Sequence, residues 1–247
     1  MNQRNRGHLD ILSDPSAVAR GLADVFSNSA QTAMSERGTF YVALAGGSTP
    51  RAAYGLLAQD PMLETVSWSD VYIFFGDERC VQVADPRSNY RMAHDAFLAI
   101  VPIPPHNVHR MPGELPPKEG AQQYAATMRQ DMGDAPRFDL IMLGIGKDGH
   151  TASLFPGVDP MTDDDQLIRA TYSEETGTDR LTITPRVINN ARTVVISAEG
   201  TEKAKGLAAA RDGAYDPIKT PIQIVSPTNG ELIWLVDHLA AGMLEKN

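Results

Sequence analysis

The sequence of 247 residues has a single cysteine, Cys80, and no long apolar run. One cysteine excludes an internal disulfide framework and fits a reducing compartment. Without roughly 18 consecutive apolar residues, the chain has no candidate membrane-spanning helix. The N-terminal segment MNQRNRGHLDIL also lacks the apolar core of a signal peptide. We therefore expect a cytoplasmic protein that does not associate with a membrane.

Basic residues are in the minority, with 22 Lys and Arg against 31 Asp and Glu, for a net charge of −9. This balance disfavours nucleic acids and anionic lipid surfaces as partners. An anionic ligand must instead be held by locally placed cations and backbone N–H groups. We expect a small-molecule substrate as the partner. Length and an ordinary apolar content of 42% fit one α/β domain, or one domain with a small appendage, and we expect a single domain over residues 1–247. We expect a monomer or small homo-oligomer.

Short apolar runs alternate with helical patterns along most of the chain. The predicted strands are 40–45, 71–75, 139–143, 168–172, 180–184, 193–197, 222–225 and 232–236. The predicted helices cover about 14–37, 50–58, 118–132 and 200–211, with others starting at residue 88 and after the last strand. Strands that alternate with helices predict a mostly parallel, doubly wound sheet with helices on both faces. The runs at 180–184 and 193–197 are too close for a long crossover, so a short helix or an antiparallel edge should join them.

Three polar turns follow predicted strands, at residues 46–49, 76–79 and 144–150. In open α/β sheets, ligands bind outside the carboxyl ends of the strands. We therefore expect these three turns to converge on one site.

The third turn lies in FDLIMLGIGKDGHT, residues 138–151, which contains the pattern G-x-G-x-x-G. This pattern is typical of a dinucleotide-binding turn, which requires a long helix after the third glycine. Here Pro156 allows at most one or two helical turns, and the motif lies beyond the middle of the chain. We expect no dinucleotide and no other cofactor. A tight turn alone would explain the glycines but not Asp148 and His150.

The first turn, Gly46-Gly47-Ser48-Thr49, lies between a predicted strand and a predicted helix. Glycines allow close approach of backbone N–H groups to an anion, and the helix dipole favours negative charge there. Ser48 and Thr49 can bind phosphate oxygens or simply cap the helix, and both interpretations stay open.

The second turn, Gly76-Asp77-Glu78-Arg79, places three charged residues after a buried strand. Arg79 suits bidentate binding of a phosphate group, and Asp77 can contact sugar hydroxyls. The alternative is a local cluster of ion pairs. A separate H-x-x-H spacing at His106 and His109 has too few companion ligands, so we expect no metal site.

Together these turns resemble the 6-phosphogluconolactonase family. The matching segments are 43–50, 74–81, 88–93, 107–114, 143–156, 180–191 and 202–204, with the late Trp234 and Asp237. The string GxGxDGHTASLFP is the most specific of them. The resemblance implies a modified Rossmann-like fold, shared with glucosamine-6-phosphate deaminases. It also implies hydrolysis of 6-phospho-D-glucono-1,5-lactone to 6-phosphogluconate, in the oxidative branch of the pentose phosphate pathway.

Two alternatives within this fold are a sugar-phosphate deaminase or isomerase and a non-catalytic sugar-phosphate sensor. Deaminases carry a glutamate five residues after the histidine, where this chain has Phe155, and favour a tyrosine where it has Arg79. Regulators with this fold follow a DNA-binding helix-turn-helix, for which we expect no room because the fold begins within 15 residues. Both features favour the lactonase.

For that reaction we expect His150 to act as general base on water, because an imidazole titrates near neutral pH. Asp148 can orient the imidazole or contact the sugar. Backbone N–H groups around Gly146 and Gly149 are candidate donors to the oxyanion. The predicted phosphate ligands are Ser48, Thr49, Arg79, Lys203 and Arg180. Two interpretations of Arg186 stay open: a further contact to the phosphate group or a charge on the protein surface.

Overall fold

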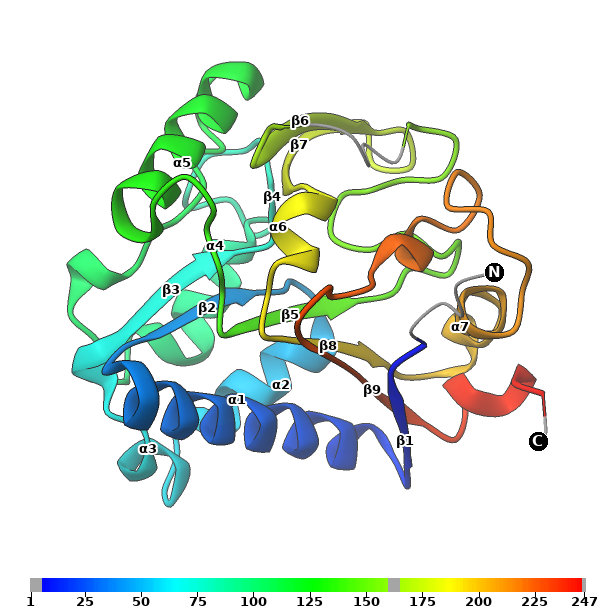
Figure 1. Cartoon of the computed structure of the whole chain (residues 1–247), viewed down its shortest axis with the longest axis horizontal. Helices are drawn as coiled ribbons and strands as arrows, with labels where there is room; N and C mark the ends of the chain where they lie inside the picture. The colour runs from blue at the N-terminus through cyan, green and yellow to red at the C-terminus, as the bar shows by residue number, and fades with distance from the viewer. Residues whose placement is uncertain (1–5, 160–164, 246–247) are drawn as a thin grey trace.

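The computed structural model describes residues 6–159 and 165–245 of the chain. Its centre is a six-stranded sheet in the order β1-β9-β8-β5-β2-β3, with every neighbouring pair parallel (Figure 1). The strands are β1 His8–Leu12, β2 Phe40–Leu44, β3 Val71–Phe75, β5 Leu140–Gly144, β8 Thr193–Ala198 and β9 Glu231–Asp237. This confirms the predicted, mostly parallel α/β sheet.

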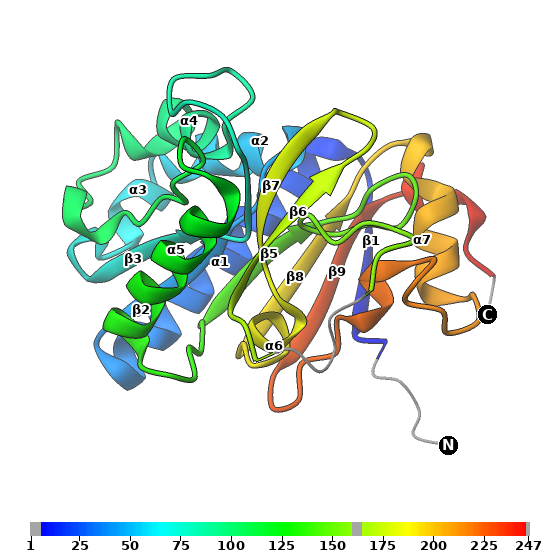
Figure 2. The ribbon, with the colours of Figure 1, turned by 90° about the horizontal axis from the view of Figure 1, so that it is seen from above.

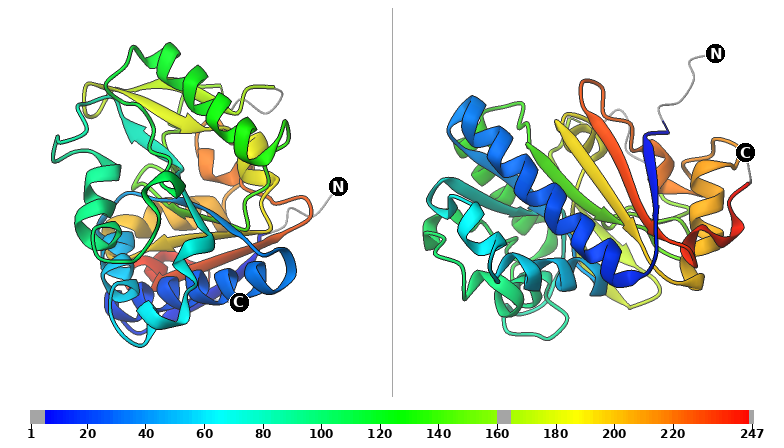
Figure 3. Two further views of the ribbon diagram at one scale, coloured as in Figure 1. Left: turned by 90° about the vertical axis from the view of Figure 1, so that its left-hand side faces the viewer. Right: turned by 90° about the horizontal axis from the view of Figure 1, so that it is seen from below.

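One face of this sheet is covered by helices α1 and α2, which pack against each other (Figure 3). Helix α1 spans Pro15–Arg37 and α2 spans Ser48–Leu57. The ends of α1 follow from its sequence. The Asp14 carboxylate accepts a hydrogen bond from the N–H of Ala17, and Pro15 supplies a preset first turn. Gly38 ends the helix in the left-handed conformation, with φ 77°.

The opposite side carries a second, antiparallel sheet in the order β4-β7-β6 (Figure 2). Its strands are β4 Asp77–Arg79, β6 Ile168–Ser173 and β7 Thr178–Ile183, and helix α5 Pro117–Met132 packs on β6 and β7. Gly76 connects the two sheets. Its N–H donates to the carbonyl of Leu44 in β2, and its own carbonyl accepts from the N–H of Ile183 in β7, both at 2.9 Å.

The remaining helices are short. They are α3 Met62–Thr65, α4 Asn89–Ala93, α6 Pro185–Asn189 and α7 Ala204–Arg211, with a π-helical turn at His94–Leu98 and several 3₁₀ turns. Helix α6 confirms the short helix expected between residues 184 and 193. None of the helices in residues 6–159 and 165–245 is long and apolar enough to cross a membrane.

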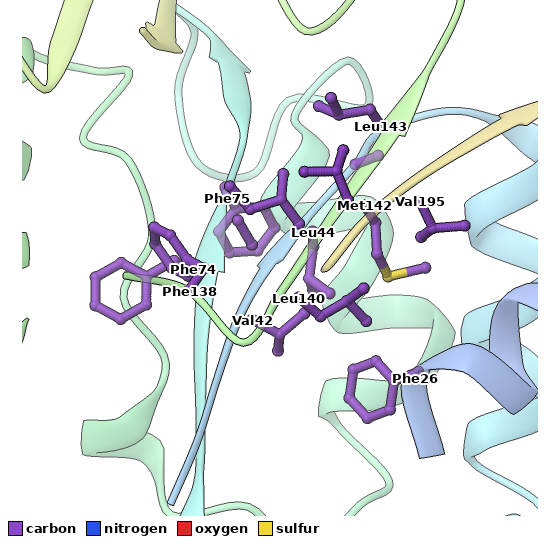
Figure 4. Packing of buried hydrophobic residues seen from close by; sticks show 14 of the residues in the cluster. Phe26, Val42, Leu44, Phe74, Phe75, Phe138, Leu140, Met142, Leu143 and Val195 are labelled. Atoms are coloured by element: carbon purple, nitrogen blue, oxygen red, sulfur yellow. The ribbon is translucent and has the colours of Figure 1, made fainter. Parts of the chain in front are cut away.

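The hydrophobic core lies on both faces of the central strands (Figure 4). Val42 and Leu44 of β2 and Leu140 and Met142 of β5 are all fully buried. Burying a large apolar side chain contributes about 1.5–3 kcal/mol, more than the net worth of a typical hydrogen bond. These continuous apolar strands therefore hold the sheet together and leave the polar turns at its edge available for other chemistry.

Three features differ from the sequence prediction. Residues 77–79 form strand β4 and not a turn, because they pair with β7 across the junction at Gly76. Residues 222–225 are not a strand, since Pro221–Ile224 forms a 3₁₀ turn. The edge strand β1 was not predicted.

Two buried tyrosine hydroxyls form hydrogen bonds with the backbone at the carboxyl ends of strands β2 and β3. The Tyr54 hydroxyl donates to the carbonyl of Ala45 at 2.9 Å and accepts from its N–H at 3.0 Å. The Tyr124 hydroxyl accepts from the N–H of Phe75 at 2.8 Å and donates to the carbonyl of His109 at 3.1 Å. Burial raises the pKa of both phenols. These hydroxyls satisfy backbone groups at the points where the polar turns begin.

Replacing Tyr54 with phenylalanine is expected to lower the free energy of unfolding by about 1–3 kcal/mol, because buried backbone groups of Ala45 lose their partner. Equilibrium urea denaturation measures the change. Tyr72→Phe is the matched control, since Tyr72 is half-buried in the neighbouring strand, and it should shift stability by less than about 0.5 kcal/mol. Equal stabilities of Tyr54→Phe and the wild type would contradict the role given to this hydroxyl.

Candidate active site

The three polar segments meet in one cleft of about 270 Å³ at the carboxyl ends of β2, β3 and β5. Its polar and charged lining comes from Asp77, Arg79, Asn89, His150 and Lys203, and its glycines are Gly46, Gly47, Gly76, Gly144 and Gly146. This confirms the predicted convergence.

The glycine turn after β5 is closed by its own hydrogen bonds. The N–H of Gly146 donates to the carbonyl of His150 at 2.8 Å, and the N–H of Gly149 donates to the carbonyl of Gly146 at 3.0 Å. The buried Thr151 hydroxyl donates to the carbonyl of Gly144 at 2.8 Å. The N–H groups of Gly146 and Gly149 are therefore both used within the turn. The role of N–H groups around these two glycines as donors to an oxyanion stays a prediction, for which neighbouring residues of the turn would have to supply the donors.

The glycines of this turn have a different purpose. A Cβ atom on Gly146 would lie 2.1 Å from Nδ1 of His150 and 2.5 Å from a carboxylate oxygen of Asp148. Gly149 has φ 85°, and a Cβ there would lie 2.8 Å from the side chain of Thr220. Glycine at 146 lets the turn fold back on its own functional side chains.

His150 and Asp148 form a directly bonded pair, with 2.6 Å between Nδ1 and Oδ1. The same carboxylate oxygen accepts from the backbone N–H of His150 at 3.2 Å. Burial acts to raise the pKa of Asp148, but the charge of protonated His150 and its hydrogen bonds outweigh it and hold that pKa below its usual range. An ionised carboxylate only accepts, so Nδ1 carries a proton in both charge states of the ring, and Nε2 has a free lone pair whenever the imidazole is neutral.

The imidazole is partly open to solvent, with 28% of the side chain exposed. The ring of Phe155 lies beside it, with 5.3 Å between ring centroids. Ala152, which also lines the cleft, is the one non-glycine residue with positive φ in the described part of the chain, at 47°. Such backbone strain is characteristic of functional sites.

The turn at 46–49 lies at the start of helix α2. Gly47 has φ 111° and precedes helix α2, so the N–H groups of Gly47, Ser48 and Thr49 have no acceptor within the helix. The exposed Ser48 hydroxyl donates to Glu199 at 2.9 Å, and Thr49 is 7% exposed. Neither hydroxyl residue lines the cleft, whereas Gly46 and Gly47 do.

The segment after β3 holds its charged residues in distinct environments. Glu78 is 2% exposed, and its carboxylate accepts hydrogen bonds from Ser88 and from the N–H groups of residues 79, 89 and 90. Burial raises the pKa of Glu78, although these bonds act in the opposite direction. Asp77 instead faces the cleft and accepts from the Ser153 hydroxyl at 2.6 Å. The buried carboxylate of Glu78 thus holds residues 88–90 against strand β4, whereas the charges of Asp77 and Arg79 face the cleft.

Arg180 lies directly opposite Arg79 in the β4–β7 pair, which places both side chains on one face of the small sheet. Arg180 is 6% exposed, donates to the Thr176 hydroxyl at 2.7 Å and does not line the cleft. Burial and then the neighbouring Arg79 lower its pKa. Within the described residues, neither guanidinium forms an ion pair with a carboxylate.

Lys203 lines the cleft at the end of a 3₁₀ turn that leads into α7. In residues 6–159 and 165–245 its ammonium group has neither a hydrogen bond nor a carboxylate partner. Asp237, 1% exposed, accepts from the N–H of Gly200 and fixes the start of this turn. Lys203 is therefore a free cation at the cleft.

Two other predicted features lie elsewhere. Arg186 forms an ion pair with Asp165 at 2.8 Å and lines a separate cavity of about 710 Å³. His109 stacks on Phe74 and lies 2.9 Å from Asp131. Over the described stretches, no group of three or more potential metal ligands is found.

Residues 13–234 match the family model described as glucosamine-6-phosphate isomerases/6-phosphogluconolactonase. A curated 6-phosphogluconolactonase from Synechocystis sp. is 42% identical over 213 residues, which cover 84% of this chain and 86% of that protein. Among solved structures, the devB protein has a TM-score of 0.88 at 32% identity, covering 96% of this chain and 99% of that one. The 6-phosphogluconolactonase of Thermotoga maritima has a TM-score of 0.81 at 28% identity, with 93% and 99% covered.

Proposed function

Since this chain belongs to the glucosamine-6-phosphate isomerase/6-phosphogluconolactonase family, we propose that it hydrolyses 6-phospho-D-glucono-1,5-lactone to 6-phosphogluconate. The observation that carries this proposal is the composition of the cleft. It joins a carboxylate-oriented histidine to the cations Arg79 and Lys203, neither of which is ion-paired in the described residues. An enzyme that hydrolyses a 6-phosphorylated lactone needs a base near C1 of the substrate and cationic groups that bind the phosphate at the other end.

In the proposed mechanism, Nε2 of His150 takes a proton from a water molecule, which then attacks C1 of the lactone. Asp148 holds the imidazole through Nδ1, so the correct nitrogen faces the reacting water and the imidazolium that forms is stabilised. Collapse of the tetrahedral intermediate breaks the bond between C1 and the ring oxygen. The imidazolium returns its proton to that oxygen, which becomes the hydroxyl of the open-chain acid.

This mechanism needs no covalent intermediate on the enzyme. Two hydroxyl residues follow His150 closely in sequence, Thr151 and Ser153. Ser153 is 1% exposed, and its hydroxyl donates to the carboxylate of Asp77. Thr151 is fully buried and bonded to the backbone. Neither residue lines the cleft, so neither hydroxyl is placed to attack a bound lactone.

The phosphate group is proposed to bind Arg79 and Lys203, with the N–H groups at the start of α2 as further donors. Arg180 is buried beside Arg79 and adds positive potential without lining the cleft. Two adjacent guanidinium groups without a carboxylate partner repel each other, and an incoming phosphate dianion relieves that repulsion.

The same family includes deaminases, and the position of Phe155 separates the two activities. The apolar ring lies beside His150, where a deaminase has a glutamate able to exchange protons. The decisive assay compares hydrolysis of freshly generated 6-phosphogluconolactone with ammonia release from glucosamine 6-phosphate. Ammonia release without lactone hydrolysis would overturn the proposal, and absence of both would indicate a sensor.

We further propose that residues 1–247 act as one lactonase domain in the cytoplasm, as a monomer or small homo-oligomer. The support for one domain is that a single family model spans residues 13–234. The single cysteine fits the same compartment.

Replacing Arg79 with alanine is expected to raise KM for the phosphorylated lactone roughly tenfold to a hundredfold, with kcat changed far less. Hydrogen bonds between charged groups are worth about 1.5–3 kcal/mol, which sets this range. Steady-state kinetics on phosphorylated and unphosphorylated gluconolactone measure the effect. Arg20→Ala, an exposed arginine on α1, is the control and should leave both substrates unaffected. An equal loss on both lactones would contradict a phosphate role for Arg79.

A further inference from the structure

We propose that Asn89 is a positioning residue for substrate binding, which holds Arg79 in the cleft and keeps its charge available to the phosphate group. This inference rests on the proposed function and deepens it. Asn89 was not predicted as a site residue from the sequence, although it lies in the matching segment 88–93.

The side-chain amide of Asn89 bridges the two accessible charges of strand β4. Its Oδ1 accepts from Nη1 of Arg79 at 2.7 Å. Its Nδ2 donates to the backbone carbonyl of Asp77 at 2.8 Å and to the carboxylate oxygen Oδ1 at 3.2 Å. The amide orientation is fixed, because a guanidinium only donates and a carboxylate only accepts.

Asn89 itself is held from several sides. It is 1% exposed and begins helix α4, and its backbone N–H donates to the buried carboxylate of Glu78 at 2.7 Å. A Cβ atom on Gly46 would lie 2.0 Å from Oδ1 of Asn89, so the first polar turn packs directly on the amide. Asn89 therefore contacts two of the three segments that form the cleft and lines the cleft itself.

A neutral amide between a carboxylate and a guanidinium has an electrostatic consequence. Asp77 and Arg79 lie two residues apart on one strand, yet in the described part of the chain they form no ion pair. Asn89 accepts a hydrogen bond from Arg79 and donates one to the carboxylate of Asp77, so the amide stands between the donor and the acceptor of a direct pair. A direct Asp77–Arg79 pair would neutralise the cation, whereas the interposed amide leaves its charge for an anionic ligand.

Arg79 is also tied at one further point, where Nη1 donates to the backbone carbonyl of Arg87 at 2.6 Å. Both hydrogen bonds use the same nitrogen. The other guanidinium nitrogens have no protein acceptor in the described residues, which leaves them for a bidentate contact with phosphate oxygens.

The test is a double-mutant cycle on Asn89 and Arg79. Asn89→Asp keeps the shape of the side chain but places a negative charge against Arg79, and we expect KM for the phosphorylated lactone to rise about tenfold or more. Unphosphorylated gluconolactone should be hydrolysed within about threefold of the wild-type rate. In an Arg79→Ala background, Asn89→Ala, which adds no charge to the cleft, should change KM by less than about twofold, because the cation that the amide positions is absent.

Asn107→Asp is the matched control. Asn107 is also 1% exposed and donates through Nδ2 to a backbone carbonyl, that of Ser69, but it does not line the cleft. Any destabilisation from a buried new charge appears in both variants, while a rise in KM specific to the phosphorylated lactone appears only in Asn89→Asp. Asn89→Ala, which removes the bridge without adding charge, should raise KM in the same direction.

Binding measured by calorimetry separates this inference from the proposed activity. 6-Phosphogluconate and gluconate are titrated into the wild type, Asn89→Asp and Asn89→Ala, and only the phosphorylated compound should lose affinity. Equal losses on both substrates, additive effects in the cycle, or unchanged KM in both variants would overturn the role of Asn89. A wild type without lactone hydrolysis that still shows the selective loss of 6-phosphogluconate would overturn the proposed function alone.

Discussion

Alanine in place of His150 is expected to lower kcat for lactone hydrolysis by about a hundredfold or more, with KM within about threefold of the wild type. General-base catalysis contributes about 10²–10⁴ to a rate, and among the residues that the structure describes no second imidazole lines the cleft. Substrate binding is kept, because the proposed phosphate ligands lie on other segments. The lactone opens spontaneously in water, so the variant must be measured against the uncatalysed background at the same pH.

His106→Ala is the control for this substitution, since His106 is an exposed histidine outside the cleft. It should retain wild-type turnover. If His150→Ala also retained wild-type turnover, the base would have to be another group. If it raised KM with kcat unchanged, His150 would be a binding residue.

Gly146→Ala is expected to have a similarly large effect, although glycine has no functional group. The new Cβ atom would lie 2.1 Å from Nδ1 of His150 and 2.5 Å from Asp148, closer than real Cβ atoms approach other heavy atoms. The bonded pair must therefore move, and a shift of about 1 Å in a catalytic group costs on the order of a hundredfold in rate. We expect kcat to fall to that extent, measured in the same assay.

Gly55→Ala is the matched control, because a Cβ atom on Gly55 meets nothing within 4 Å and the position is helical. It should be neutral or slightly stabilising, as alanine is the better helix former. A Gly146→Ala enzyme that folds and retains wild-type kcat would show that the close contact at His150 is not needed for activity.

The convergence of the three turns could be predicted from the sequence, because parallel strands must end at the same edge of a sheet. The glycine string, His150 and Arg79 were identified for the same reason. The bond between Asp148 and His150 could not, since it depends on the exact path of a turn with a glycine at φ 85°. Spacing alone left Asp148 free to contact either the histidine or the sugar.

The small antiparallel sheet could not be foreseen, because β4 has only three residues and charged side chains. Its partner β7 is remote in sequence, so no local pattern signals the pairing. This explains why Arg180, which is paired opposite Arg79, was predicted as a direct ligand and is instead buried outside the cleft. Asn89 was missed because an amide acquires a role only through the residues packed around it.

The junction at Gly76 determines a dimension of the site. His150 and Lys203 follow strands of the parallel sheet, whereas Arg79 lies on the antiparallel one. The two sheets are joined there by one residue, whose N–H bonds to β2 and whose carbonyl bonds to β7. The distance between the His150 end and the Arg79 end of the cleft is therefore set by the backbone at Gly76, and it does not depend on which side chains line the two ends.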